Sequence, residues 1–211
     1  IIPMGCVEKH GLHLPLGTDI IHSSHIAYLA SQLETVTVFP DFVFGDYPVN
    51  SPNVPAGTIT LTLDLEMALL EQLCEQIARN GYKKILVLNG HGGNISWLAS
   101  FSRMLANKKR DFVFATYMLG LPAPHTIAKY ILENGRGSVP ELTTEDEDLL
   151  LKYHEEEMEI GHGCMGETAF LMGICPESVK LDRLGIESGL SEHKTDYLYK
   201  AGIKIRDFER N

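Results

Sequence analysis

Side chains that can bind metal ions gather in a short stretch near the start of the chain. Glu8 and His10 are separated by a single residue and follow the apolar run 1–4. On an extended backbone, side chains at this spacing point to the same face. Asp19 comes after a loop with proline and glycine, which can turn the chain back toward them. We therefore expect Glu8, His10 and Asp19 to meet at the carboxyl end of a strand.

A second stretch, Asn89–Asn94, reads Asn-Gly-His-Gly-Gly-Asn and directly follows the apolar run 85–88. Its glycines let the backbone come close to a ligand. Open α/β sheets bind ligands at the carboxyl ends of their strands. His91 is therefore predicted to reach the same edge of the sheet as the first stretch.

These four side chains, Glu8, His10, Asp19 and His91, are of the types that Zn²⁺, Mn²⁺ or Fe²⁺ accept. A carboxylate such as Asp19 can bridge two ions about 3.5–4 Å apart, and a water between them would lose a proton near neutral pH and become a nucleophile. A single histidine or glutamate is more often an ordinary core or surface residue, and the glycine-rich stretch alone fits a tight turn or an anion-binding nest. Two dense stretches at two strand ends favour a metal site.

Hydrophobic periodicity predicts the elements that position these stretches. Strands are predicted at 1–4, 35–39, 84–88, 112–118 and 202–206, and helices at 18–33, 64–80, 95–107, 144–156 and 167–173. The proline-, asparagine- and glycine-rich stretch 42–58 predicts a loop near the site, and 122–159 is otherwise predicted to be irregular. This alternation predicts an α/β fold, in which a mostly parallel sheet has helices on both faces.

The whole chain, residues 1–211, is expected to form one domain, with further residues upstream because Ile1 already opens a strand. The net charge of −10 disfavours a nucleic-acid partner. No apolar run reaches the length of about 18 residues that a membrane helix needs. The four cysteines form no CxxC pair, which favours a reducing cytoplasm.

The two stretches resemble the creatininase (creatinine amidohydrolase) family. The resemblance rests on Ile2-Pro3-Met4-Gly5, Glu8-Lys9-His10-Gly11, His13-Leu14-Pro15, Asp19, Pro55, Gly57-Thr58 and Asn89–Asn94. A third segment, Gly161–Ala169, resembles the family's His-Ala-Gly-Glu-x-Glu-Thr-Ser. The match covers roughly residues 1 to 180.

This resemblance implies a binuclear metal centre that hydrolyses C–N amide bonds. Carried over by position, Glu8, Asp19 and His91 hold one ion, while His10 and the bridging Asp19 hold the second. The family includes creatininases, formamide hydrolases that act on opened purine or pyrimidine precursors, and a peptidase of redox-cofactor maturation. Its members tend to form hexamers, so a hexameric homo-oligomer is expected.

The second ion is where the chain departs from the creatininases proper. They carry a ligating glutamate where Gly93 stands, so we expect Glu167 of the third segment to supply the missing carboxylate. His162 resembles the histidine that passes a proton to the leaving nitrogen. Met165 and Ala169 replace a Glu and a Ser of the family segment, and the stretch before His162 lacks the tryptophan that covers creatinine.

Other candidate donors are weighed against Glu167. His13 and Cys164 are rivals for the second ion, although His13 is assigned to a contact with a ligand or the substrate. His22 is a further candidate ligand, and His25 fits the apolar face of a helix. The remaining histidines lie in no motif: His125, His154 and His193.

The predicted function is hydrolysis of a small amide or cyclic amide by metal-bound hydroxide, with two divalent ions per chain. One alternative is a formamide hydrolase (deformylase) or short-peptide hydrolase with the same centre. A different class is a catalytically inactive family member that binds a small molecule. The intact ligand set favours an enzyme, whereas Gly93 favours the inactive alternative.

Overall fold

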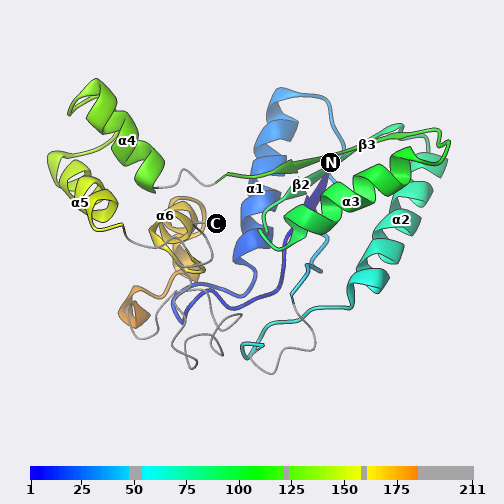
Figure 1. Cartoon of the computed structure of the whole chain (residues 1–211), viewed down its shortest axis with the longest axis horizontal. Coiled ribbons are helices and arrows are strands. Elements are labelled where there is room, and N and C mark those ends of the chain that lie inside the picture. Colours follow the sequence, from blue (N-terminus) through cyan, green and yellow to red (C-terminus); the bar gives the residue numbers. More distant parts are fainter. Residues whose placement is uncertain (48–53, 121–123, 158–160, 185–211) are drawn as a thin grey trace, which may run out of the picture.

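The computed structural model describes residues 1–47, 54–120, 124–157 and 161–184 (Figure 1). The strands are β1 (Ile2–Met4), β2 (Lys84–Asn89) and β3 (Val113–Met118). The helices are α1 (Thr18–Leu33), α2 (Leu63–Arg79), α3 (Asn94–Ala106), α4 (Pro124–Asn134), α5 (Thr144–Glu155) and α6 (Met165–Ile174), followed by the 3-10 turns Pro176–Ser178 and Leu181–Arg183. None of the described helices combines the length and apolar character that crossing a membrane requires.

The described strands form a parallel sheet in the order β1-β2-β3, as predicted. Successive side chains of a strand point to opposite faces. Ile85 and Val87 of β2 pack in the main core with α2 and α3, whereas Leu88 packs with Ala27 of α1. Helices therefore cover both faces of the sheet, and the predicted α/β class is confirmed.

Five of the predicted helices and three of the predicted strands lie at or within two residues of their predicted bounds. The bounds of α1 are those predicted, Thr18–Leu33. On α2, Leu70, Cys74 and Ala78 recur every four residues and are all buried. That spacing places one apolar stripe against the sheet and leaves the charged face to solvent.

The strand predicted at 35–39 is absent. The segment lies beside β1, and the N–H of Phe39 donates to the carbonyl of Ile1. The next such bond runs from the N–H of Phe42 to the carbonyl of Pro3. The donor is thus three residues further along its segment, whereas the acceptor is only two residues further along β1. Pro3 has no N–H to donate, so a regular ladder cannot continue and the segment stays irregular.

Helix α4 lies in the stretch 122–159 that was predicted to be irregular outside one helix. Pro124 opens it and Gly135 follows its end at φ 88°, a pair of helix-boundary signals that were available in the sequence. It pairs with α5, and Ala128, Ile131 and Leu150 form a small separate core. The strand predicted at 202–206 lies outside the described residues, as does part of the loop 42–58.

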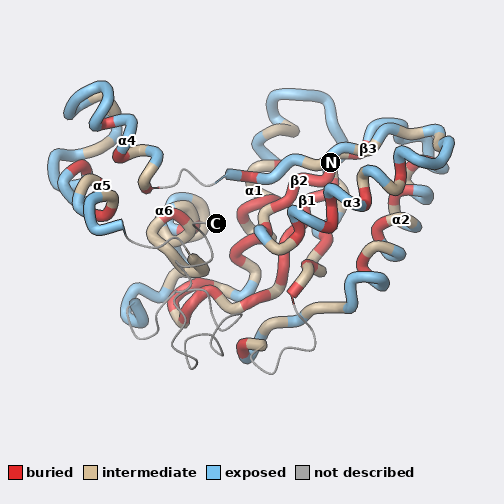
Figure 2. Tube along the Cα trace, in the orientation of Figure 1, coloured by how far each residue is buried: buried red, intermediate tan, exposed pale blue. Residues whose placement is uncertain are grey.

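The carboxyl ends of β1 and β2 run into two loops that remain buried. Figure 2 shows the burial continuing from β1 into the loop before α1. Helix α6 packs on α1, where the ring of Phe170 lies 4.1 Å from that of His22. Three segments distant in sequence are thereby brought to one edge of the sheet.

Candidate metal centre

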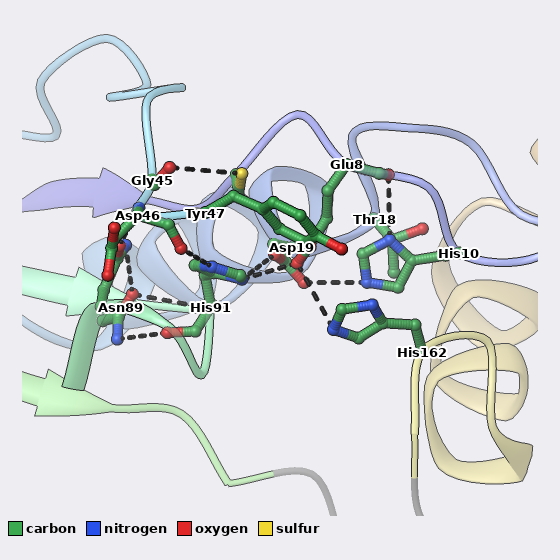
Figure 3. Close-up of polar contacts among 12 residues, drawn as sticks. Glu8, His10, Thr18, Asp19, Gly45, Asp46, Tyr47, Asn89, His91 and His162 are labelled. Carbon is green, nitrogen blue, oxygen red and sulfur yellow. Dashed lines mark hydrogen bonds and ion pairs between the residues drawn. The ribbon is translucent and has the colours of Figure 1, made fainter. Parts of the chain in front are cut away.

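Glu8, His10, Asp19 and His91 meet at the carboxyl ends of β1 and β2 (Figure 3). All four are almost completely buried, with exposures of 1%, 0%, 4% and 2%. The loop after β1 carries the first pair, the first turn of α1 carries Asp19, and the loop after β2 carries His91. The sequence-based expectation that these residues share one edge of the sheet is therefore matched by the geometry.

The ring of His91 is oriented by backbone contacts. Its Nε2 lies 3.0 Å from the carbonyl of Asp46, which can only accept, so Nε2 carries a proton. The side chain of Asn89 bonds both the N–H and the carbonyl of His91, at 3.1 and 2.8 Å. Nδ1 then faces Glu8 Oε1 at 2.6 Å and Asp19 Oδ2 at 3.0 Å.

His10 repeats this arrangement with its nitrogens exchanged. Its Nδ1 lies 3.1 Å from the carbonyl of Glu8 and therefore donates. Its Nε2 faces the other oxygen of the same Asp19, Oδ1, at 3.2 Å, and Glu167 Oε1 at 3.6 Å. Asp19 thus has one oxygen toward each imidazole and lies between the two rings.

Several atoms at this point have no well-formed hydrogen bond although they are buried. They are Glu8 Oε1 and Oε2, His10 Nε2 and Asp19 Oδ2. Buried polar groups without partners are costly, and converging carboxylates repel one another. One group of potential ligand atoms that lie within 4.8 Å of each other consists of Glu8, His10 and Asp19. The donor set therefore fits divalent cations, which would satisfy these atoms and offset their charge.

The charge pattern has a consequence for the protein without metal. Burial alone would lower the pKa of His91, but the carboxylates of Asp19 and Glu8 raise it to about 10. The pKa of His10 is likewise raised, against burial, by Asp19 and Glu167. Despite burial, these two rings hold the pKa of Asp19 well below its usual range.

Metal binding should therefore release protons. The raised pKa values of both rings favour their protonated forms in the metal-free protein, and a bound imidazole must be neutral, so protons leave on binding. Apparent metal affinity should rise with pH up to about pH 10, where His91 itself loses its proton. Calorimetry in buffers of different ionisation enthalpy measures this release. A binding heat that is independent of the buffer would contradict it.

The third segment approaches from α6. Glu167 lies in the first turn of α6, where its Oε2 accepts the N–H of Gly163 at 2.6 Å while Oε1 faces His10. His162 Nε2 lies 3.6 Å from Glu8 Oε1, and its ring centre is 5.0 Å from that of His10. With 26% of its side chain exposed, His162 lies at the solvent side of the cluster.

The rival donors lie in other settings. His13 Nε2 is bonded to Thr168, and His22 packs on Phe170. Cys6 joins Glu8 and His91 in a second group of potential ligand atoms. Burial raises the pKa of its thiol far above the usual range, and it donates to the carbonyl of Gly45 at 3.6 Å. A neutral thiol is a poor ligand.

The other histidines and the single tryptophan lie elsewhere. His125 and His154 contact each other at 3.1 Å between α4 and α5, and His193 lies outside the described residues. His25 packs near Phe170. Trp97 is buried in α3, with its Nε1 donating to Asn94 Oδ1 at 2.9 Å.

Two residues of the site could not be identified from the sequence. Asp46 acts through its backbone: its carbonyl accepts from His91 and its N–H donates to Asn94 Oδ1 at 2.9 Å. Tyr47 is 2% exposed, and its backbone N–H donates to the hydroxyl of Thr60. The loop prediction placed this region near the site, but a backbone carbonyl leaves no signature in residue type.

Gly93 is required by the contact between Asp46 and His91. A Cβ at this position would lie 2.4 Å from the Asp46 oxygen and 2.4 Å from His91 Nε2. Gly93→Ala should therefore lower the stability by about 1–3 kcal/mol through overpacking and weaken metal binding. Gly92→Ala is the matched control, because a Cβ there meets nothing within 4 Å. Equal melting temperatures and metal contents for the two variants would contradict this account.

Comparison with known proteins gives a family and several relatives. The family model "Creatininase: Creatinine amidohydrolase" matches residues 1–208. The mycofactocin precursor peptide peptidase of Mycolicibacterium smegmatis is 29% identical over 114 residues, which are 53% of this chain and 46% of that protein. The 2-amino-5-formylamino-6-ribosylaminopyrimidin-4(3H)-one 5'-monophosphate deformylase of Methanobrevibacter smithii is 26% identical, over 74% of this chain and 67% of that protein. The creatinine amidohydrolase of Pseudomonas putida is 21% identical, over 87% of this chain and 67% of that protein. The match thus spans less than half of the peptidase and about two thirds of the other two relatives.

Solved structures share the fold. A putative creatinine amidohydrolase from Bacteroides fragilis superposes with a TM-score of 0.61 at 24% identity, covering 97% of this chain and 71% of that one. A structure described as "Creatininase Mn" superposes with a TM-score of 0.60 at 18% identity, covering 86% of this chain and 68% of that one. A mutant creatininase described as "Zn-Zn type" superposes with a TM-score of 0.58 at 17% identity, covering 86% of this chain and 68% of that one. Because the family model matches nearly all of its residues, this chain belongs to the creatininase family.

Proposed function

We propose that the chain is an amidohydrolase that uses two divalent metal ions to cleave a C–N bond of a small amide or cyclic amide. The observation that carries this proposal is the paired orientation of His10 and His91. A backbone carbonyl accepts from one nitrogen of each ring, and the other nitrogen faces a different oxygen of Asp19. A single carboxylate between two oriented imidazoles suits a pair of ions.

In this proposal Glu8, Asp19 and His91 hold one ion, and His10, Asp19 and Glu167 hold the other. Bound ions would supply Lewis acidity and a water of lowered pKa. The protein keeps the ligands rigid, because each ring is fixed by its backbone acceptor, and such outer contacts tune metal sites strongly. Burial of the carboxylates limits competing water and strengthens their electrostatic action.

His162 is proposed as the proton carrier. It is the partly exposed imidazole of the cluster, and its Nε2 lies 3.6 Å from Glu8 Oε1. A carboxylate beside the ring can hold it and orient its proton toward the leaving nitrogen. The amine leaves only after it has been protonated, so this transfer completes cleavage of the C–N bond.

The names of the relatives and neighbours support the substrate and metal classes. They include a peptide peptidase, a deformylase and a creatinine amidohydrolase, and neighbouring structures include Zn-Zn and Mn forms. We propose Zn²⁺, Mn²⁺ or Fe²⁺ as the metal. We also propose a hexameric homo-oligomer in the cytoplasm, supported by the exposed apolar side chains of Leu33, Val113 and Tyr117 and by four free thiols.

A substrate panel tests the proposed function. Cyclic amides, N-formyl amines and short peptides are incubated with protein reconstituted separately with each of the three metals. We expect metal-dependent hydrolysis in at least one class, abolished by a chelator and restored by the metal. Preference for N-formyl amines would favour the deformylase alternative, for which the relative from Methanobrevibacter smithii gives the support. Tight metal binding without hydrolysis of any class would favour the inactive, small-molecule-binding alternative.

A further inference from the structure

We propose that His13 is a positioning residue that holds the turn before α6 in place, so that Glu167 reaches the second metal ion. This inference rests on the proposed function, because it concerns the second ion of that centre. It assigns His13 neither to a metal nor to the substrate but to a hydrogen bond between the first and third segments of the site.

The contact that links the two segments is direct. His13 is 6% exposed although it lies in a loop, and its Nε2 lies 2.9 Å from the hydroxyl oxygen of Thr168. That hydroxyl donates its own proton to the carbonyl of Gly163 at 3.3 Å. A hydroxyl has one proton, so Thr168 accepts from His13, whose Nε2 must carry a proton.

The turn that this contact holds is closely packed. Gly163 has φ 72°, and a Cβ there would lie 2.9 Å from the carbonyl oxygen of His10 and 3.0 Å from His13 Cε1. The turn is thus pressed against the backbone of one proposed ligand and against the ring of His13. The backbone of His10 and the ring of His13 therefore both limit where this turn can lie relative to the first segment.

The same turn sets the orientation of Glu167. The N–H of Gly163 donates to Glu167 Oε2 at 2.6 Å, which leaves Oε1 facing His10 Nε2 at 3.6 Å. A continuous series of contacts therefore runs from His13 through Thr168 and Gly163 to the carboxylate. Loss of the His13 ring would free the turn and let Glu167 swing away from the second ion, while the first ion keeps all of its ligands.

Metal titration of His13→Ala, His13→Gln and Thr168→Val tests the proposal. The probe is Mn²⁺ alone, followed by metal analysis and by electron paramagnetic resonance, which distinguishes a coupled pair from a single ion. We expect His13→Ala to keep one tight ion and to bind the second about 10–100-fold more weakly. His13→Gln should restore the second ion, because an amide N–H can donate to Thr168.

The Thr168→Val variant breaks the same bond from its other end. It should lower the affinity for the second ion as His13→Ala does. The double variant His13→Ala/Thr168→Val should bind the second ion no more weakly than either single variant, because both changes remove the same hydrogen bond. Second-ion affinity equal to that of the wild type in both single variants would overturn the proposal. Loss of both ions in His13→Gln and in Thr168→Val would overturn it too, because that indicates a general structural role. A wild-type protein that binds no metal would instead remove the proposed function itself.

Discussion

Asp19→Ala should lose both metal ions and hydrolytic activity together. One oxygen of Asp19 faces His91 Nδ1 at 3.0 Å and the other faces His10 Nε2 at 3.2 Å, so in the proposed centre a single carboxylate would serve both ions. Removal of one electrostatic group from an active site costs about 10²–10³-fold in rate, and here two ions depend on it. We expect a loss of roughly 10³-fold or more. Metal content and turnover of the best panel substrate measure it.

Asp182→Ala is the control for this change. Asp182 is exposed and belongs to neither group of potential ligand atoms, so its loss should leave metal content, rate and circular dichroism unchanged. An Asp19→Ala protein that is folded and retains two ions and its full rate would show that the bridging role is wrong. Loss of one ion alone would assign Asp19 to a single site.

Glu167→Gln should lose one ion per chain and keep the fold. Without this carboxylate the second ion has only His10 and Asp19, whereas catalytic zinc usually has about three protein ligands. Glu167 carries a partly buried side chain at the start of α6, where the helix dipole also favours a negative group. The amide keeps the size of the side chain and its acceptor for Gly163, so the turn should survive. Activity should fall together with the second ion.

Glu155→Gln provides the matched control, because it makes the same change on the exposed surface of α5. It should retain both ions. If Glu167→Gln also retains both ions and its rate, the second site is built from another donor. In that case the role of Glu167 is to stabilise the start of α6, where the helix dipole favours a negative charge.

The part of the site that the sequence predicts lies at strand ends. Glu8, His10 and His91 come soon after apolar runs, and parallel strands bring their carboxyl ends to one edge, so the meeting of these residues follows from where the predicted strands end. Asp19 could be placed because the bounds of its helix were predicted correctly, although the face that this helix buries is made of small and polar residues. The family resemblance then added the third segment, and the structure brings Glu167 and His162 to the cluster.

The parts that sequence reasoning missed depend on backbone geometry. The carbonyl of Asp46 orients His91, but any residue type has a carbonyl, so its role is invisible in the sequence. Gly93 was interpreted from the sequence only as the loss of a ligand, and the structure adds that a Cβ there would collide with the Asp46 carbonyl and the His91 ring. The strand predicted at 35–39 failed because Pro3, on the neighbouring segment, has no N–H to give.

The most direct test of a two-metal centre is a crystal structure of protein reconstituted with Zn²⁺, with anomalous data collected at the zinc edge. We expect two anomalous peaks about 3.5–4 Å apart. One should lie among Glu8, Asp19 and His91, and the other among His10, Asp19 and Glu167, with ligand oxygens at about 2.0–2.2 Å. Asp19 should contact both. A structure with no peak at this edge of the sheet, or with a single peak at full reconstitution, would contradict the account.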